Sequence, residues 1–141
     1  MAVIKGADRH SRRLRNMRGI KTVEKIGQGV FTLADIGRVE AQLSITKGSV
    51  SGKNHVASAP GEAPNRDTSE LDQSIIAYKT GPVSAVYSAN TPYAAAQEFG
   101  HTYDDGRVLA ERPYMRPSAD KVRARIKDVM GNVVKAIIRE S

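Results

Sequence analysis

The feature that most constrains the fold of this chain is a long amphipathic pattern between Gly19 and Ile45. Apolar residues recur there at intervals of mostly three or four positions, at Ile20, Val23, Ile26, Val30, Leu33, Val39 and Leu43. This spacing predicts a helix of roughly 40 Å, which is long for a small domain. Three glycines inside the pattern indicate bends, a break into two shorter helices, or points of close packing: Gly27, Gly29 and Gly37. A helix of this length needs packing partners besides the core of its own small domain.

The composition fits one globular domain. The chain has 141 residues, of which 40% are hydrophobic and 26% are charged, which is enough apolar material for a single core. It contains no cysteine, so disulfides and thiolate metal sites are excluded. No apolar run approaches the roughly twenty residues that a membrane span needs. We therefore expect a soluble, unexported protein with no membrane partner.

Positive charge is concentrated at the N-terminus. The first 21 residues carry seven basic side chains and one acidic side chain, whereas the remaining chain is nearly neutral. We divide the chain into a basic arm, residues 1–18, and a single domain, residues 19–141. The arm is either an electrostatic partner for phosphate or an acidic protein surface, or a solvated, frayed terminus. Its candidate contact residues are Lys5, Arg9, Arg12, Arg13, Arg15 and Arg18.

An extended loop is expected at about residues 46–72. Its stretch SAPGEAPNRDTSELDQSI, from Ser58 to Ile75, combines prolines with glycine, acids and hydroxyls. Proline fixes φ and removes a donor, and the polar side chains compete for local backbone hydrogen bonds, so this stretch predicts neither a helix nor a central strand. It is an ordered connector or a docking loop.

An antiparallel hairpin is predicted after the loop. The segments Ser74–Thr80 and Val83–Ala89 are rich in β-branched and aromatic residues, and the turn signal Gly81-Pro82 separates them. Asp105-Gly106 marks a second tight turn, and Val108-Leu109 follows it as a third strand. A sheet this small has open edges, which makes it a candidate for pairing with another copy of itself.

Two further helices complete the predicted order. A short helix is expected between Pro92 and Gly100, with Thr91 as its N-cap. A final amphipathic helix starts near Ser118 and carries one apolar stripe, at Val122, Ile126, Val129, Met130, Val133 and Ile137. The predicted fold class is α+β: a long N-terminal helix, a small antiparallel sheet made of the hairpin and a third strand, a short helix, and a C-terminal amphipathic helix.

The sequence contains incomplete versions of known catalytic and nucleotide-binding motifs. The segments Gly48–Asn54 and Gly27–Thr32 lack residues that phosphate-binding and dinucleotide-binding loops require. The densest group of titratable residues could ligate a hard or borderline metal ion, but it lies at a predicted helix end and turn, where such residues are common for local reasons: Glu98, His101, Asp104 and Asp105. We expect no enzymatic activity, no metal and no cofactor.

Three short motifs in the second half resemble a known family. They are Thr68–Ile75 (TSELDQSI), Tyr93–Gly100 (YAAAQEFG) and Arg112–Pro117 (RPYMRP), in this order and followed by an amphipathic helix. This pattern is similar to the head-to-tail joining proteins of tailed bacteriophages, the neck or tail-completion group that includes minor tail protein Z of phage lambda. The chain departs from the family pattern at Ser69, where the family favours glycine. The motif residues have structural interpretations: Leu71, Ser74, Ile75, Tyr93, Glu98, Gly100, Arg112, Pro113, Met115 and Pro117.

The resemblance implies a structural virion protein, assembled in the host bacterial cytoplasm and located in the virion neck at the top of the tail. It implies a closed homo-oligomeric ring, taken as a hexamer, that joins the head-closure or connector protein to the tail terminator or tail tube protein and surrounds the genomic DNA without reading its sequence. The stiff loop would then be an inter-subunit contact, through Pro60, Gly61, Glu62, Pro64 and Asp67. The alternative is a small nucleic-acid-binding module that uses the N-terminal arm.

Overall fold

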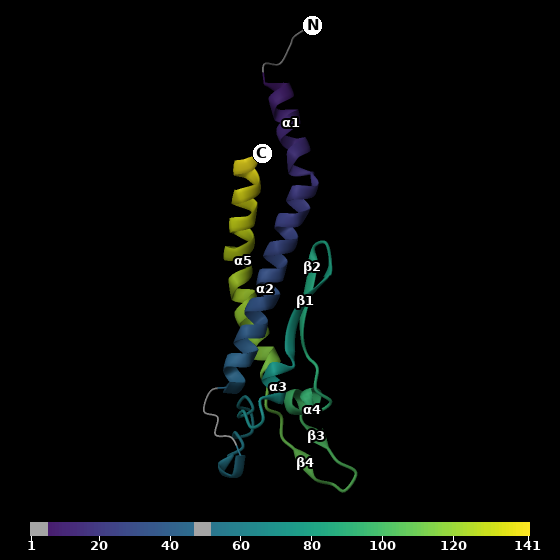
Figure 1. Cartoon of the computed structure of the whole chain (residues 1–141), viewed down its shortest axis with the longest axis vertical. Coiled ribbons are helices and arrows are strands. Elements are labelled where there is room, and N and C mark those ends of the chain that lie inside the picture. The colour runs from purple at the N-terminus through teal and green to yellow at the C-terminus, as the bar shows by residue number, and fades with distance from the viewer. Residues whose placement is uncertain (1–5, 47–51) are drawn as a thin grey trace.

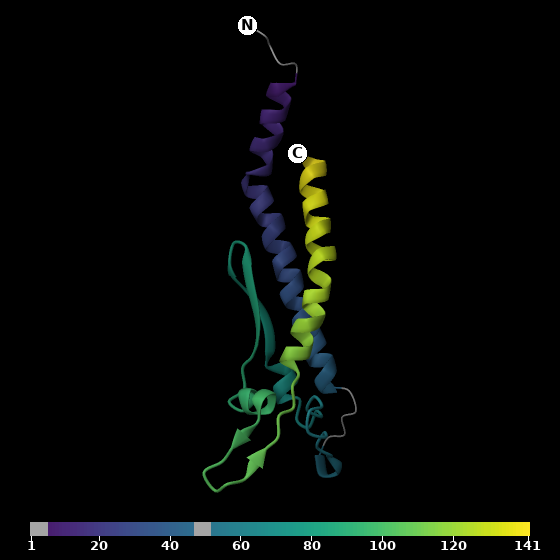
Figure 2. The same ribbon diagram turned by 180° about the vertical axis from the view of Figure 1, so that it is seen from behind.

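The computed structural model describes residues 6–46 and 52–141 of a long, thin molecule. The helices α1 (Ala7–Met17) and α2 (Ile20–Thr46) run in nearly the same direction, and α5 (Met115–Glu140) lies antiparallel beside α2 (Figure 1). The reverse view in Figure 2 also shows α1 projecting past the end of α5. The fold is the predicted mixture of a long N-terminal helix, an antiparallel hairpin, a short helix and a C-terminal helix.

The remaining elements lie between α2 and α5 in the chain. They are a 3₁₀ turn (Gly52–Asn54), α3 (Glu70–Gln73), β1 (Ile75–Gly81), β2 (Ser84–Ala89), α4 (Ala94–Phe99), β3 (His101–Thr102) and β4 (Val108–Leu109). The expectation that Ser58 to Ile75 would contain no helix is wrong at α3, a single helical turn. That turn forms because its side chains Leu71 and Asp72 are buried, and tertiary contacts of this kind override weak local preference.

The predicted long helix is one unbroken element, and its glycines are points of close packing. A Cβ atom at Gly27 would collide with the main-chain carbonyl of Pro82 at the hairpin tip. A Cβ atom at Gly29 would lie 2.7 Å from a methyl group of Val133 in α5, and one at Gly37 would lie 2.5 Å from the Tyr87 ring. The glycines therefore let the hairpin and α5 approach α2 from different sides.

The third strand does not join the hairpin sheet. β1 and β2 form one two-stranded antiparallel sheet, in which Ile75 faces Ala89 and Tyr78 faces Val86. β4 instead pairs with β3 in a second small sheet. The cause is local, because the predicted turn at Asp105-Gly106, with Gly106 at φ 81°, folds β4 back onto β3.

The basic arm is helical over Ala7–Met17, so the alternative of a frayed terminus is wrong for these residues. Arginine, leucine and methionine are good helix formers, and Asp8 in the first turn interacts favourably with the positive end of the helix dipole. None of its residues is buried. Lys5 lies outside the described residues.

Two predicted helix starts shift, that of α4 by two residues and that of α5 by about three. α4 begins at Ala94, so Thr91 does not occupy the N-cap position. α5 begins at Met115 rather than near Ser118, which places Pro117 in the first helical turn. Proline is tolerated there because the first N–H groups of a helix have no partner within it.

The hydrophobic core lies at one end of the molecule. It consists of small and aliphatic residues around one tyrosine: Ala41, Ile45, Leu71, Ile75, Ala94 and Tyr114. We call this end the base, defined as residues 52–75 and 89–118, against which the last part of α2 packs with the core residues Ala41 and Ile45. The opposite end, residues 7–33 and 126–141, is the rod. Among the residues of the rod, all of which the structure describes, only Gly27 and Gly29 are buried.

Candidate functional site: a capped base and a basic rod

A buried carboxylate connects two of the three sequence motifs. Glu98 lies in α4 and is only 3% exposed, and its side chain faces the start of α5. One oxygen, Oε2, accepts hydrogen bonds from the main-chain N–H groups of Tyr114 and Met115 at 2.8 and 2.9 Å. The other, Oε1, accepts the N–H of Arg116 at 2.9 Å. Glu98 therefore caps the N-terminus of α5 from a different helix.

The electrostatics of this cap favour the charged form of Glu98. Burial alone raises the pKa of its carboxyl group, but the hydrogen bonds from the three main-chain N–H groups and from the Arg116 guanidinium outweigh burial and hold the pKa below its ordinary value. The neighbouring phenol of Tyr114 is also buried, and burial together with the charge of Glu98 raises the pKa of Tyr114 to about 12. Tyr114 stays protonated and donates its O–H to the Ala94 carbonyl at 3.3 Å.

Gly100 allows the chain to turn sharply after α4. Its φ is 76°, a left-handed conformation that favours glycine, and a Cβ atom there would lie 2.8 Å from the Leu109 carbonyl oxygen. The main-chain N–H of Arg112 donates to the Gln97 carbonyl at 2.7 Å. Pro113 directly precedes Tyr114, the N-cap residue of α5. The second and third motifs thus form one structural unit.

The first motif joins the same end of the molecule. Leu71 and Ile75 enter the core, and Ser74 accepts the Asn90 N–H at 3.3 Å, which ties β1 to the end of β2. Ser69 has φ 65°, so the position where the family that the motifs resemble favours glycine does adopt a left-handed turn in this chain. Tyr93, the first residue of the second motif, is 38% exposed beside α3.

The proline-rich loop packs against its own chain, at the residues that precede α5. Gly61 donates its N–H to the Glu111 carbonyl at 2.9 Å, and Arg112 donates to the Ser58 carbonyl at 3.2 Å. Pro64 is buried, and Asp67 accepts the Gly52 N–H at 3.2 Å. Of the five predicted contact residues, all but Pro64 are exposed, so a second molecule could reach Pro60, Gly61, Glu62 and Asp67.

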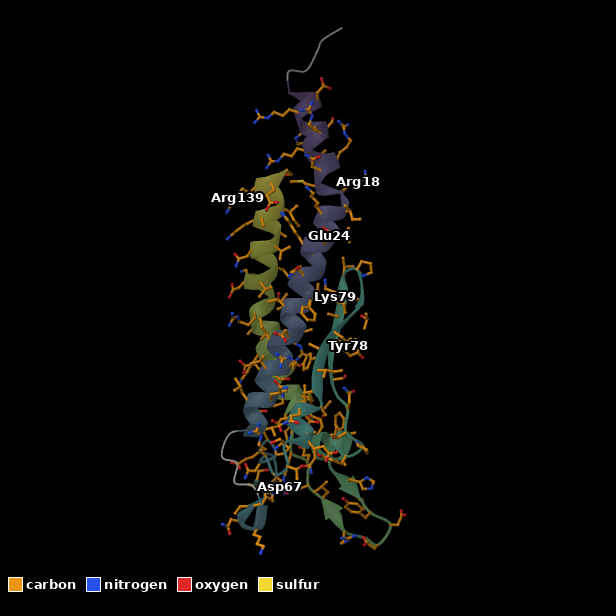
Figure 3. The ribbon with its side chains drawn as sticks, viewed as in Figure 1. Arg18, Glu24, Asp67, Tyr78, Lys79 and Arg139 are labelled. Atoms are coloured by element: carbon orange, nitrogen blue, oxygen red, sulfur yellow. The ribbon has the colours of Figure 1, made fainter. Side chains whose placement is uncertain are left out.

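The arginines of the arm lie on the rod. Arg9, Arg12, Arg15 and Arg18 are exposed and form no ion pair among the described residues. Arg13 differs from them, because its guanidinium donates to the Ile138 carbonyl at 3.2 Å and so contacts the last turn of α5. Figure 3 shows Arg18 and Arg139 at the same end of the molecule, with Asp67 at the other end.

The four candidate metal ligands are not assembled into a site. Glu98 is occupied by the cap, and Asp105 accepts hydrogen bonds from Arg107 at 3.0 and 2.7 Å. His101 packs edge-on against the ring of Tyr103. Within residues 6–46 and 52–141, no three His, Cys, Asp or Glu side chains are placed to hold a metal ion together.

Several structural residues were not predicted. Gln42 donates its amide to the Asp72 carbonyl at 2.9 Å, and Asp72 in turn forms a 2.6 Å ion pair with Arg66. These contacts join α2, α3 and the loop across 30 and 6 positions of sequence, a separation at which periodicity carries no signal. The role of Glu98 as a cap was also missed, since its partners lie 16 to 18 residues away.

Comparisons with protein families, with characterised proteins and with solved structures find no match for this chain. In the part of the chain that the structure describes, no helix is both long enough and apolar enough to cross a membrane.

Proposed function

We propose that this chain is a non-enzymatic structural protein of the neck of a tailed bacteriophage. In this role it forms a closed, sixfold ring that joins the head connector to the tail terminator or tail tube and surrounds the DNA channel. The proposal rests on the three sequence motifs and on one property of the molecule, namely that a single copy leaves much of its apolar surface uncovered.

That uncovered surface is the observation that carries the proposal. Six large hydrophobic side chains of the rod are exposed: Leu14, Ile20, Val23, Ile126, Val134 and Ile138. The outer face of the hairpin adds Ile76, Tyr78 and Val86, which are 47%, 45% and 39% exposed. Extended apolar surface of this kind is typical of subunits that pack against copies of themselves, and a contact that closes into a ring covers it in every copy.

The open edges of the hairpin support the same conclusion. In the β1–β2 sheet each strand has one neighbour, so each keeps an edge with unpaired main-chain groups. An edge strand of an adjacent copy can pair there, and the docked loop with exposed Pro60 and Glu62 offers a second contact. The roles of Glu98 and Gly100 in the chain support a structural function for the motifs.

Native mass spectrometry and light scattering at low and high salt test the ring. We expect one closed oligomer whose size is the same in about 0.05 M and 1 M salt, since apolar contacts are little affected by screening. The double substitution Ile76→Asp and Tyr78→Asp should dissociate it. Thr102→Asp, which adds charge to an exposed strand of the other sheet, is the control and should leave it intact. A wild-type protein that stays monomeric at all concentrations would overturn the proposal.

The unpaired arginines of α1 favour the second candidate, a nucleic-acid-binding module. If the protein is a neck ring, changing Arg12, Arg13, Arg15 and Arg18 to Gln should leave folding and ring size unchanged and should impair head–tail joining or DNA retention in the particle. If the purified monomer instead bound one particular DNA sequence at nanomolar strength in physiological salt, and these changes abolished the binding, the module would replace the neck ring.

A further inference from the structure

A cleft in the rod is lined by side chains from three helices and by cations from two of them, α1 and α2. It has a volume of about 390 Å³ and lies between the junction of α1 with α2 and the last turn of α5. Arg15 comes from α1, Lys21 and Lys25 come from α2, and Ile137 and Glu140 line the opposite wall. Two of these cations, Lys21 and Lys25, lie outside the basic arm that the sequence indicated.

Among the described residues, Glu140 is the only acidic side chain that lines this cleft. It forms an ion pair with Lys25, and this hydrogen bond and charge lower the pKa of Glu140, with further lowering by Lys21 and Arg139. Its carboxylate is therefore close to three cations at once. Because the side chain of Glu140 is 62% exposed, it neutralises part of this charge without being locked in place.

The end of α5 does not cancel the positive charge of the cleft. The C-terminal carbonyls of a helix carry partial negative charge, but Arg13 donates to one of them, the Ile138 carbonyl, at 3.2 Å. Of the charged side chains that line the cleft, Arg15, Lys21 and Lys25 are cations and Glu140 is an anion, so the cations exceed the carboxylates by two. Arg13, which contacts Ile138, and Arg139, which lowers the pKa of Glu140, add positive charge next to the cleft.

We propose that this cationic cleft binds a backbone phosphate of duplex DNA and that Glu140 limits its affinity. The inference rests on the proposed function, in which DNA passes through the ring. An excess of positive charge around an open cleft suits a phosphate group, which projects from the duplex. The exposed Arg9 and Arg12 on α1 and Arg18 at its C-cap then contact neighbouring phosphates, so DNA with its uniform, dense charge fits better than a protein surface with scattered carboxylates.

The test is a salt titration of DNA binding by the full chain. Binding is measured by the fluorescence anisotropy of a labelled duplex of arbitrary sequence. Arg15→Gln with Lys21→Gln, the cleft pair, should weaken binding and lower the slope of log K against log salt by roughly one to two, since each lost phosphate contact removes about 0.9. Glu140→Gln should have the opposite effect and tighten binding roughly threefold at low salt. The control is Arg125→Gln with Lys127→Gln, which removes the same charge from α5 outside the cleft and should change the slope less.

Three results would overturn the cleft as a phosphate site. The first is a Glu140→Gln variant that binds DNA no more tightly than the wild type. The second is a control pair that lowers the salt slope as much as the cleft pair does, which would mean diffuse attraction. The third is polyglutamate of equal charge that binds as tightly and responds to the same variants, which would identify an acidic protein as the partner.

The same variants separate this inference from the neck ring itself. If the cleft pair forms normal rings that join heads to tails but keeps the wild-type salt slope, the cleft fails and the ring stands. If the wild-type protein is monomeric while the cleft pair and Glu140→Gln shift DNA binding as expected, the ring fails and the cleft stands.

Discussion

In the base of the molecule, five basic side chains face eight acidic ones, and three of the five form ion pairs within the chain: Arg66, Arg107 and Arg116. In the rod, ten basic side chains face four acidic ones, and the pair of Lys25 with Glu140 is the single ion pair among those residues. Both ends leave large hydrophobic side chains exposed, six in the rod and five in the base, so the two ends differ mainly in charge. The base is largely self-sufficient in its ion pairs, whereas most cations of the rod have no acidic partner among the described residues.

The sharpest test of a self-sufficient base is removal of its cap. Glu98→Ala leaves three main-chain N–H groups at the start of α5 without an acceptor in a buried site, so we expect the free energy of unfolding to fall by about 3 kcal/mol. Urea denaturation measures this. Glu111→Gln removes a carboxylate that contacts the same Arg116 at an exposed position, and this control should cost less than about 0.5 kcal/mol. Equal losses in the two variants would contradict the cap.

The second prediction probes where the hairpin meets α2. Gly27→Ala inserts a methyl group against the Pro82 carbonyl, and overpacking of this kind should destabilise the protein by about 2 kcal/mol. Gly131→Ala in α5 is the matched control, because no atom lies within 4 Å of the added Cβ and alanine favours the helix by about 1 kcal/mol. Thermal or urea unfolding should thus give shifts of opposite sign. Stabilisation by both changes would mean that the hairpin is free to move away.

The third prediction concerns strain in the base. Ser69 holds φ 65° and its side chain makes no capping hydrogen bond, so Ser69→Gly should raise the free energy of unfolding by about 1 kcal/mol. Ser69→Ala removes the same hydroxyl but keeps a Cβ atom, and it should give no such gain. A loss of stability in the glycine variant would show that the turn is not strained.

The smallest expected effect is a dependence of stability on acid. The pKa of Glu98 is lower in the folded protein than the ordinary value of about 4.3 in the unfolded chain. Its contribution is therefore complete above the unfolded pKa and is lost as the pH falls through the folded pKa. The urea midpoint should be level from pH 7 to about 5 and then decline. In Glu98→Gln this decline should be shallower than in the wild type, and an identical decline would argue against the cap.

Local patterns predicted the elements well but not their partners. The spacing of apolar residues located α2 to within one residue at either end, and the turn signal Gly81-Pro82 located the hairpin. The third strand was placed in the wrong sheet because β3, its partner, has only two residues and shows no strand pattern, although the turn at Asp105-Gly106 that joins the two was predicted. α3 was missed because four residues are too few to show a helical period, and burial of Leu71 and Asp72 decides its conformation.

The candidate site was predictable only in its charge. Counting residues was enough to find the basic arm, since net charge needs no knowledge of folding. That count already included Lys21, but its grouping with Lys25 and with Arg139 and Glu140 of α5 could not be found this way, because it depends on the antiparallel placement of α5 beside α2. The resemblance of the three motifs predicts a ring that still awaits measurement, and the cap by Glu98 gives a physical reason why two of the motifs occur together.

The three close-packed glycines of α2 have a mechanical consequence. Gly27 contacts the hairpin tip, Gly29 contacts α5, and Gly37 contacts Tyr87. The helix is therefore packed tightly against its neighbours at three positions along its axis and on different sides. Sliding α2 along its axis by one residue would push a bulky side chain into each of these contacts, and turning it would do the same. A force applied to the rod is therefore transmitted to the base through α2, because α2 cannot slide against the hairpin or α5.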